Sequence, residues 1–92
     1  MFEWDEEKRK DNLEKHGVDF VRAAMIFTKP VIEFTDERRD YGETRLIALG
    51  HVGDEYYRVV YTWRGPNRRL ISAWRAGQDG KRRYQAVHAR RN

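Results

Sequence analysis

Residues 56–75 read YYRVVYTWRGPNRRLISAWR, in which two runs rich in aromatic and β-branched residues flank the group Gly65-Pro66-Asn67. Such runs favour strands, whereas glycine, proline and asparagine favour the turn between them. The pattern predicts a hairpin with strands over 56–63 and 69–75. Because successive side chains of a strand point to opposite faces, one face of the first strand is predicted to be core. That face carries Tyr57, Val59, Tyr61 and Trp63.

The other face of this hairpin is the candidate working surface. Arg58 and Arg64 lie on it in the first strand, and two arginines on a half-covered sheet indicate a solvated face. The register of the hairpin decides which residues of the second strand join them. A three-residue loop pairs Arg64 with Arg68 and adds Ser72 and Trp74 to this face. A slip by one residue would instead add Arg69 and Arg75.

The segments around the hairpin extend it into a meander and then a helix. Residues 31–34 and 45–52 read as strands, separated by a polar loop over 35–43. The second of them joins the hairpin through the tight-turn pair Gly53-Asp54. Downstream, the stretch from Gly77 to Gly80 is expected to break the last strand, and a short basic helix is expected over 81–91.

Two further helices are predicted before the sheet. Asp5 is a good N-cap, and Gly17 ends that helix after His16. The second helix is expected over 20–27, before Pro30, with a buried stripe of Phe20, Val21, Ala24, Ile26 and Phe27. Residues 2–4 read either as a short strand or as a lead-in. The resulting order predicts an α+β fold, with a small antiparallel sheet, two N-terminal helices and a short C-terminal helix.

The size and composition of the chain bound its class. The 92 residues are enough for a single domain, taken as residues 1–92. Cysteine is absent, which excludes disulfides and thiolate metal sites. No apolar run reaches the ~18 residues of a membrane span. The acidic start MFEWDEE does not read as a signal peptide. A cytoplasmic location without membrane attachment is therefore expected.

Charge is distributed unevenly along the chain. Residues 1–43 hold 8 Lys/Arg and 12 Asp/Glu, whereas residues 44–92 hold 11 and 3. A basic half indicates a polyanion, with nucleic acid first and an acidic protein second. No metalloprotease, P-loop, dinucleotide or serine-hydrolase motif occurs, and His51 and His88 lack partners at ligand spacing. Neither metal nor cofactor is expected. A non-catalytic nucleic-acid-binding or adaptor module is the alternative to an enzyme.

Two groups of residues resemble the BrnT family of bacterial type II toxins. The first group is Phe2-Glu3-Trp4-Asp5, Lys8, Asn12, Lys15-His16-Gly17-Val18, Phe20, Ala23 and Phe27. The second group is Thr62, Arg64, Ile71-Ser72-Ala73 and the basic segment Arg82-Arg83-Tyr84. In order and spacing the two groups cover nearly the whole chain.

The resemblance implies a RelE-like ribonuclease that cleaves RNA, free or ribosome-bound, without a metal and so blocks translation and growth. The implied partner is a BrnA-like antitoxin with a ribbon-helix-helix domain, and the complex would bind operator DNA. Many members carry arginine where this chain has Trp74, and glutamate near Gly80. Either Arg75 takes over the role of that arginine, or Trp74 serves as a platform for base stacking.

Metal-independent cleavage of RNA requires proton transfer and positive charge at the phosphate. His16 is a catalytic candidate because imidazole exchanges protons near neutral pH. Arg64 and Arg75 are candidates because a guanidinium binds two phosphate oxygens and keeps its charge. Tyr84 is the fourth, as a base or a stacking group. The candidates for RNA binding are the basic side chains of Lys8, Lys15, Arg58, Arg82 and Arg83.

Overall fold

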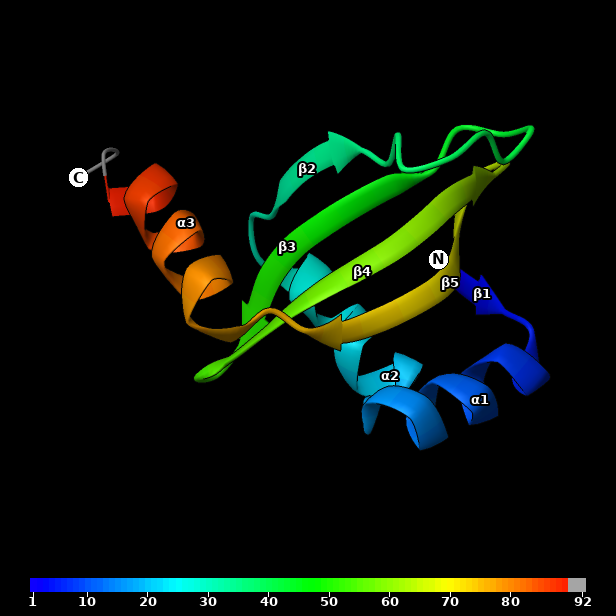
Figure 1. Cartoon of the computed structure of the whole chain (residues 1–92), viewed down its shortest axis with the longest axis horizontal. Helices are drawn as coiled ribbons and strands as arrows, with labels where there is room; N and C mark the ends of the chain where they lie inside the picture. Colours follow the sequence, from blue (N-terminus) through cyan, green and yellow to red (C-terminus); the bar gives the residue numbers. More distant parts are fainter. Residues whose placement is uncertain (90–92) are drawn as a thin grey trace.

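The computed structural model describes residues 1–89, which form a five-stranded sheet in the order β1-β5-β4-β3-β2 with helices on both faces (Figure 1). Within these residues no helix is long and apolar enough to cross a membrane. The elements are β1 (Phe2–Trp4), α1 (Glu6–His16), α2 (Phe20–Ala23), the 3-10 helix η1 (Ala24–Thr28), β2 (Ile32–Thr35), β3 (Leu46–Val52), β4 (Glu55–Arg64), β5 (Asn67–Arg75) and α3 (Gly77–Ala89).

The first strand makes the sheet mixed, and the expectation of a purely antiparallel sheet was wrong. β1 pairs with β5 in parallel, with Phe2 opposite Arg68 and Trp4 opposite Leu70. The other neighbouring strands are antiparallel. β1 and β5 are separated by more than 60 residues of the chain, so no turn signal in the sequence indicates their pairing. The residues 2–4 are therefore a strand rather than a lead-in.

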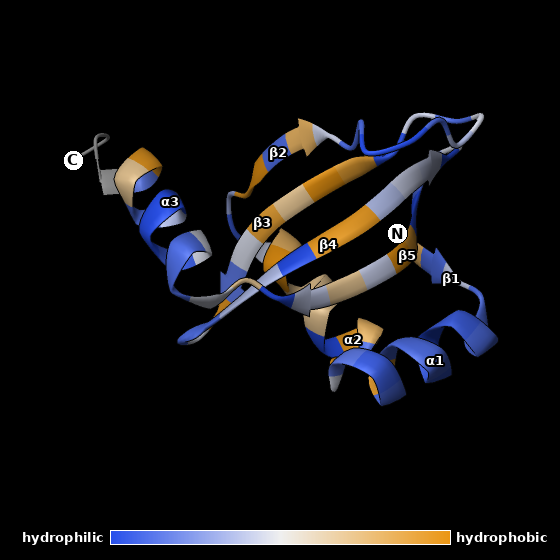
Figure 2. Cartoon of the chain, in the orientation of Figure 1, coloured by the Kyte–Doolittle hydropathy of each residue, from blue (hydrophilic) through white to orange (hydrophobic). Residues whose placement is uncertain are grey.

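The two faces of the sheet are covered by different helices. One face packs against α1, α2 and η1, and its buried cluster includes Phe20, Ile26, Tyr57, Val59, Tyr61 and Leu70. On the other face α3 covers one end, where Tyr84 clusters with Leu49 and Ala76. Figure 1 shows α3 at the far end of the molecule from α1. Figure 2 shows a hydrophilic α1 and the most hydrophobic part of the sheet in the middle of β3 and β4.

Trp63 departs from the predicted core face, because its side chain is 48% exposed. It lies one residue before the end of β4, and the guanidinium of Arg68 lies over its ring at 4.7 Å. The helices therefore do not cover the end of this strand, where the Trp63 ring packs against the Arg68 guanidinium in a cation–π contact.

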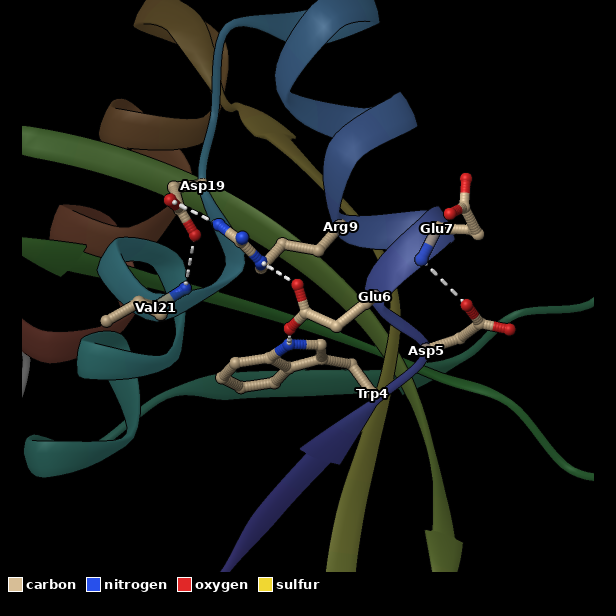
Figure 3. A network of polar contacts seen from close by, with 7 residues as sticks. All are labelled: Trp4, Asp5, Glu6, Glu7, Arg9, Asp19 and Val21. Atoms are coloured by element: carbon tan, nitrogen blue, oxygen red, sulfur yellow. Dashed lines mark hydrogen bonds and ion pairs between the residues drawn. The ribbon is translucent and has the colours of Figure 1, made fainter.

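The first helix has the predicted bounds and caps. The Asp5 carboxylate accepts a hydrogen bond from the Glu7 N–H at 2.8 Å, and Gly17 has a φ of 69°. That left-handed conformation suits glycine and ends the helix. Arg9 joins this helix to the next one, because it donates to Glu6 and to Asp19, the N-cap of α2 (Figure 3). Trp4 also donates to Glu6, at 2.9 Å, which links β1 to the same network.

The second helix is shorter than predicted and tightens into a 3-10 helix after Ala23. The predicted buried stripe is wrong at Val21, which is 57% exposed, whereas Ala23 is fully buried. Phe20, Ala23 and Ala24 are three and four residues apart, so they share one face of the helix. Val21 points away from that face.

The last strand ends at Arg75, as predicted, but the C-terminal helix begins at Gly77, earlier than the predicted residue 81, so residues 77–80 form its first turn. Gly80 lies in the first turn of α3, and a Cβ at this position would collide with the Cβ of Ala76. The glycine therefore permits close packing at the start of the helix, where the sequence pattern predicted only the end of the preceding strand. The predicted end of this helix, Arg91, lies outside the described residues.

The hairpin of β4 and β5 combines both registers that the sequence left open. Its turn has two residues, not three, because Arg64 pairs with Asn67 and not with Arg68. The register then shifts at a bulge, where Tyr61 pairs with Leu70 but Val60 pairs with Ser72. As a result Arg69 joins Thr62 and Arg64 near the turn, whereas Trp74 and Ser72 join Arg58 and Val60 further along.

Candidate functional site

The site begins with the contact between α1 and the edge of β5. β1 pairs only as far as Leu70, and beyond the bulge the edge of β5 is met by Asn12. The Asn12 amide donates to the Ala73 carbonyl at 2.8 Å, and its oxygen accepts from the Ala73 N–H at 3.0 Å. It also donates to the Val18 carbonyl at 2.9 Å and accepts from the Ser72 hydroxyl at 3.2 Å. A single buried side chain thus fixes the end of α1 against β5.

This contact places the C-terminal turn of α1 beside the last residues of β5 and forms a hollow of roughly 630 Å³. We call it the main hollow, and it is lined by Lys15, His16, Arg38, Ser72, Trp74 and Arg75. The ring centroids of His16 and Trp74 are 6.2 Å apart. The main hollow therefore combines four basic side chains with an aromatic ring, and within the described part of the chain no acidic side chain lines it.

Arg38 reaches the main hollow from the loop between β2 and β3. Its Nε and Nη2 donate to the two oxygens of Asp36, both at 2.8 Å, and its Cζ lies 5.6 Å from the centroid of the Trp74 ring. The Arg38 side chain holds the pKa of the Asp36 carboxyl at about 2. Asp36 in turn raises the pKa of the Arg38 guanidinium. Asp36 therefore stays ionised at neutral pH and keeps Arg38 in place.

Arg75 lies at the end of β5, where it is shared between the main hollow and a surface ion-pair group. It donates to Glu55 at 2.9 Å, and Arg22 donates to the other oxygen of Glu55, also at 2.9 Å. Hydrogen bonds from Arg22, Arg75 and Tyr57 lower the pKa of Glu55 to about 2. The Arg75 side chain remains 58% exposed, so it is accessible to a ligand in the main hollow.

A second, smaller hollow of roughly 200 Å³ adjoins the first, which we call the side hollow. It shares Lys15, His16 and Ser72 with the main hollow and adds Lys8, Asp11, Asn12 and Ile71. Both lysines predicted to bind RNA, Lys8 and Lys15, therefore lie along one continuous surface with His16.

The other predicted site residues lie outside both hollows. Arg64 is near the far end of β4, where Glu43 pairs with it at 3.7 Å. Arg58 is half-buried and donates to the Ala76 carbonyl at 3.3 Å. On α3, Arg82 pairs with Asp79, and the Arg83 Cζ lies 5.2 Å from the ring centroid of Phe34.

Tyr84 lies on the buried face of α3, between the helix and the sheet. Its hydroxyl donates to the Pro30 carbonyl at 2.7 Å, and burial raises its pKa above the ordinary value. Tyr56, Tyr84 and the two histidines His51 and His88 form an aromatic cluster, with ring centroids 4.2 to 5.6 Å apart. In this position Tyr84 anchors α3 on the sheet.

Sequence reasoning missed Arg38. It lies within the run DERRD of residues 36–40, which reads as an ordinary polar loop. In the folded chain Asp36 holds the guanidinium and Arg38 approaches Trp74, a contact between segments far apart in the sequence. Within the described residues no group of three or more His, Asp or Glu side chains could hold a metal ion.

Comparison with known proteins gives the same family from sequence and from structure. A family model described as "Ribonuclease toxin, BrnT, of type II toxin-antitoxin system" matches residues 4–80. The crystal structure of the Brucella abortus ribonuclease toxin, BrnT, is similar to this chain, with a TM-score of 0.62 and 28% sequence identity. That likeness covers 84% of this chain and 96% of the Brucella chain. Among curated proteins, none matches.

Proposed function

The chain belongs to the BrnT family of ribonuclease toxins of type II toxin–antitoxin systems, and on this basis we propose that RNA is bound and cleaved in the main hollow. One observation carries the proposal: a histidine, three longer cations and an exposed part of a tryptophan ring converge on one surface, which no acidic side chain of residues 1–89 lines. The family assignment also decides against the alternative of a non-catalytic module.

His16 is the proposed base of the reaction. It would take the proton of the RNA 2′-hydroxyl, whose oxygen then bonds to the adjacent phosphorus while the bond from phosphorus to the 5′-oxygen breaks. The departing 5′-oxygen takes a proton from water or from a protonated basic side chain of the main hollow. The products are a 2′,3′-cyclic phosphate and a 5′-hydroxyl end.

Arg75 is the proposed ligand of the reacting phosphate, and Lys15 is the proposed second cation. A guanidinium can bind two phosphate oxygens at once, and fixed positive charge stabilises the negative charge that develops in the transition state. These cations supply at the phosphate the charge that a metal ion supplies in other nucleases. We therefore expect the reaction to proceed without a divalent metal.

The remaining predicted residues fit the path of a longer RNA better than the reacting centre. Arg58 pairs with Trp74, the neighbour of Arg75, and so marks the level of the main hollow on β4. Arg64 lies six residues further along β4, about 20 Å from Arg58 at roughly 3.3 Å per residue. A single phosphate cannot contact both Arg64 and Arg75 over such a span. We place Lys8, Arg58 and Arg64 along the RNA, with Arg82 and Arg83 at its α3 end. A catalytic role for Arg64 or Tyr84 stays a prediction, as does RelE-like action on ribosomes.

An antitoxin is the partner that a type II system implies, and RNA is the target. We propose that the antitoxin is of the BrnA type, with a ribbon-helix-helix domain through which the complex binds its operator DNA. An acidic segment of that antitoxin would cover the main hollow and neutralise its cations, and long-range attraction would speed its capture. Both proteins would then meet in the cytoplasm.

The test compares His16→Ala and Arg75→Ala with Lys10→Ala, an exposed cation of α1 that lines neither hollow. RNA, free and ribosome-bound, is incubated with each protein in excess EDTA. We expect roughly 10²–10³-fold slower cleavage for each hollow variant and an unchanged rate for Lys10→Ala. Parental rates in both hollow variants would reject the site. Cleavage that EDTA abolishes and magnesium restores would reject the metal-free mechanism.

A further inference from the structure

In the loop of residues 36–45, Arg38 binds a carboxylate, that of Asp36, which is itself held by several hydrogen bonds. The Asp36 side chain is inaccessible to solvent, although the residue lies just beneath the surface. Its backbone N–H donates to the Arg45 carbonyl at 2.8 Å, and the Tyr41 hydroxyl donates to its carboxylate at 3.2 Å. The Arg38 N–H also donates to this carboxylate, at 3.2 Å. Asp36 is therefore also held by contacts that do not involve the Arg38 guanidinium.

The guanidinium of Arg38 is held along one edge and open along the other. A guanidinium has five N–H donors. The Nε and Nη2 atoms each use one on Asp36, so the Nη1 pair and one N–H of Nη2 remain. Among residues 1–89 Asp36 is the ion-pair partner of this guanidinium, the Tyr41 side chain also lies within its reach, and the Arg38 side chain is 58% exposed. The side chain also lines the main hollow.

Trp74 provides the second contact that orients this guanidinium. The Arg38 Cζ lies 5.6 Å from the centroid of the Trp74 ring, within the range of a cation–π contact. A carboxylate partner at one edge and an aromatic ring at its side leave the free donors with little freedom to reorient. Because a preset donor loses less entropy on binding, it binds an anion more tightly than a mobile arginine does.

We propose that Asp36, Arg38 and Trp74 form a preset subsite for an RNA phosphate adjacent to the one that is cleaved. Arg38 binds this phosphate, Asp36 is the positioning residue and the exposed part of the Trp74 ring stacks on the neighbouring base. The inference rests on the proposed function, since it places the cleaved phosphate beside His16 and Arg75. Single-stranded RNA is the ligand chemistry that uses an anion-binding group and an aromatic face together.

Arg39 provides a matched control. It carries the same charge in the same loop, one residue away, but its guanidinium lies 6.0 Å from the Tyr41 ring and it does not line the main hollow. The four variants are Arg38→Ala, Arg38→Lys, Asp36→Asn and Arg39→Ala. The Lys variant keeps the charge but loses the two-pronged contact with Asp36, so it remains informative if Asp36→Asn fails to fold.

The first measurement is the affinity of each variant for a short 2′-O-methyl oligoribonucleotide, which cannot be cleaved because its 2′-oxygen is blocked. We expect Arg38→Ala to weaken binding about tenfold, the loss of one charge-assisted contact. Its affinity should also depend less on salt, by about 0.7 in the logarithmic slope for one phosphate contact on a single strand. Asp36→Asn and Arg38→Lys should lose part of the affinity, and Arg39→Ala should match the parent.

The second measurement is cleavage of the matching unmodified RNA by the same proteins. Arg38→Ala and Asp36→Asn should raise KM with little change in kcat, because the subsite binds a phosphate that does not react. If Arg38→Ala matches Arg39→Ala in affinity, KM and salt slope, the subsite is refuted. If it instead weakens only inhibition by the antitoxin, the group binds protein and the inference is also wrong.

His16→Ala and Arg75→Ala separate this inference from the proposed function. If both variants cleave RNA at the parental rate, the proposed reacting site fails, whatever Arg38 does. If both lose cleavage while Arg38→Ala behaves as Arg39→Ala, the reacting site stands and only the subsite fails. The same cleavage experiment therefore tests the reacting site with one pair of variants, His16→Ala and Arg75→Ala, and the subsite with another pair, Arg38→Ala and Arg39→Ala.

Discussion

Replacement of Asn12 should test the contact on which both hollows depend. Asn12 is buried, with 5% of its surface exposed, and its amide meets both the N–H and the C=O of Ala73. The Asn12 side chain thereby satisfies the backbone hydrogen-bonding groups of Ala73, as a neighbouring strand would. Truncation in Asn12→Ala removes these contacts together with the one to the Val18 carbonyl. Three backbone groups then lose their partner.

The magnitude follows from the cost of an unpaired buried group, about 1–3 kcal/mol each. We use the lower end, because Asn12 lines the side hollow, through which water can reach the vacated space. Three groups then give a loss of about 3 kcal/mol in the free energy of unfolding. A domain of this length has about 5–14 kcal/mol in total. The expected fall in Tm is about 12–24 °C, at about 4–8 °C per kcal/mol.

Urea denaturation and thermal melting of Asn12→Ala provide the measurement, with Asp11→Ala, an exposed neighbour on the same helix, as the control.

A second variant, Asn12→Asp, should make the stability of the protein depend on pH. The introduced carboxylate would face the carbonyls of Val18 and Ala73, so its pKa in the folded protein would rise above that in the unfolded chain. The variant should therefore be most stable below pH ~4 and lose stability as pH rises. An Asn12→Ala protein within about 0.5 kcal/mol of the parent would refute this reasoning.

Three further outcomes are expected. The folded pKa of Asp36 is lowered from 3.8 to about 2, so its contribution to stability is present above pH ~4 and is lost on acidification; in acid-denaturation curves Asp36→Asn should lose less stability over that interval than the parent. Gly50→Ala should lower the free energy of unfolding by about 1–3 kcal/mol, because the added Cβ would lie 2.9 Å from the Ile26 Cβ; a melting curve equal to that of the parent would contradict the packing. Tyr84→Phe should cost about 1 kcal/mol in the free energy of unfolding, through the bond to Pro30; an unchanged cleavage rate in the folded variant would contradict the predicted catalytic role of Tyr84, and a large loss of rate would support it.

The sequence alone determined the elements whose cause is local. The N-cap Asp5 and the C-terminal Gly17 lie next to the helix they bound, and both ends of α1 were predicted correctly. Alternation within β4 identified Tyr57, Val59 and Tyr61 as core for the same reason, since each residue's face follows from its neighbours. The family was also evident, because its motifs are short groups whose order and spacing can be compared without a structure.

Only the tertiary structure decided what depends on residues far apart in the chain. The parallel pairing of β1 with β5, the bulge that gives the hairpin two registers and the approach of Arg38 to Trp74 each join separate segments. A contact of this kind depends on the packing of the whole core, and a one-residue change of register reverses the face of every side chain beyond it. The sequence therefore supplied His16 and Arg75 as separate candidates, and the fold placed them in one hollow with an arginine that no local pattern had indicated.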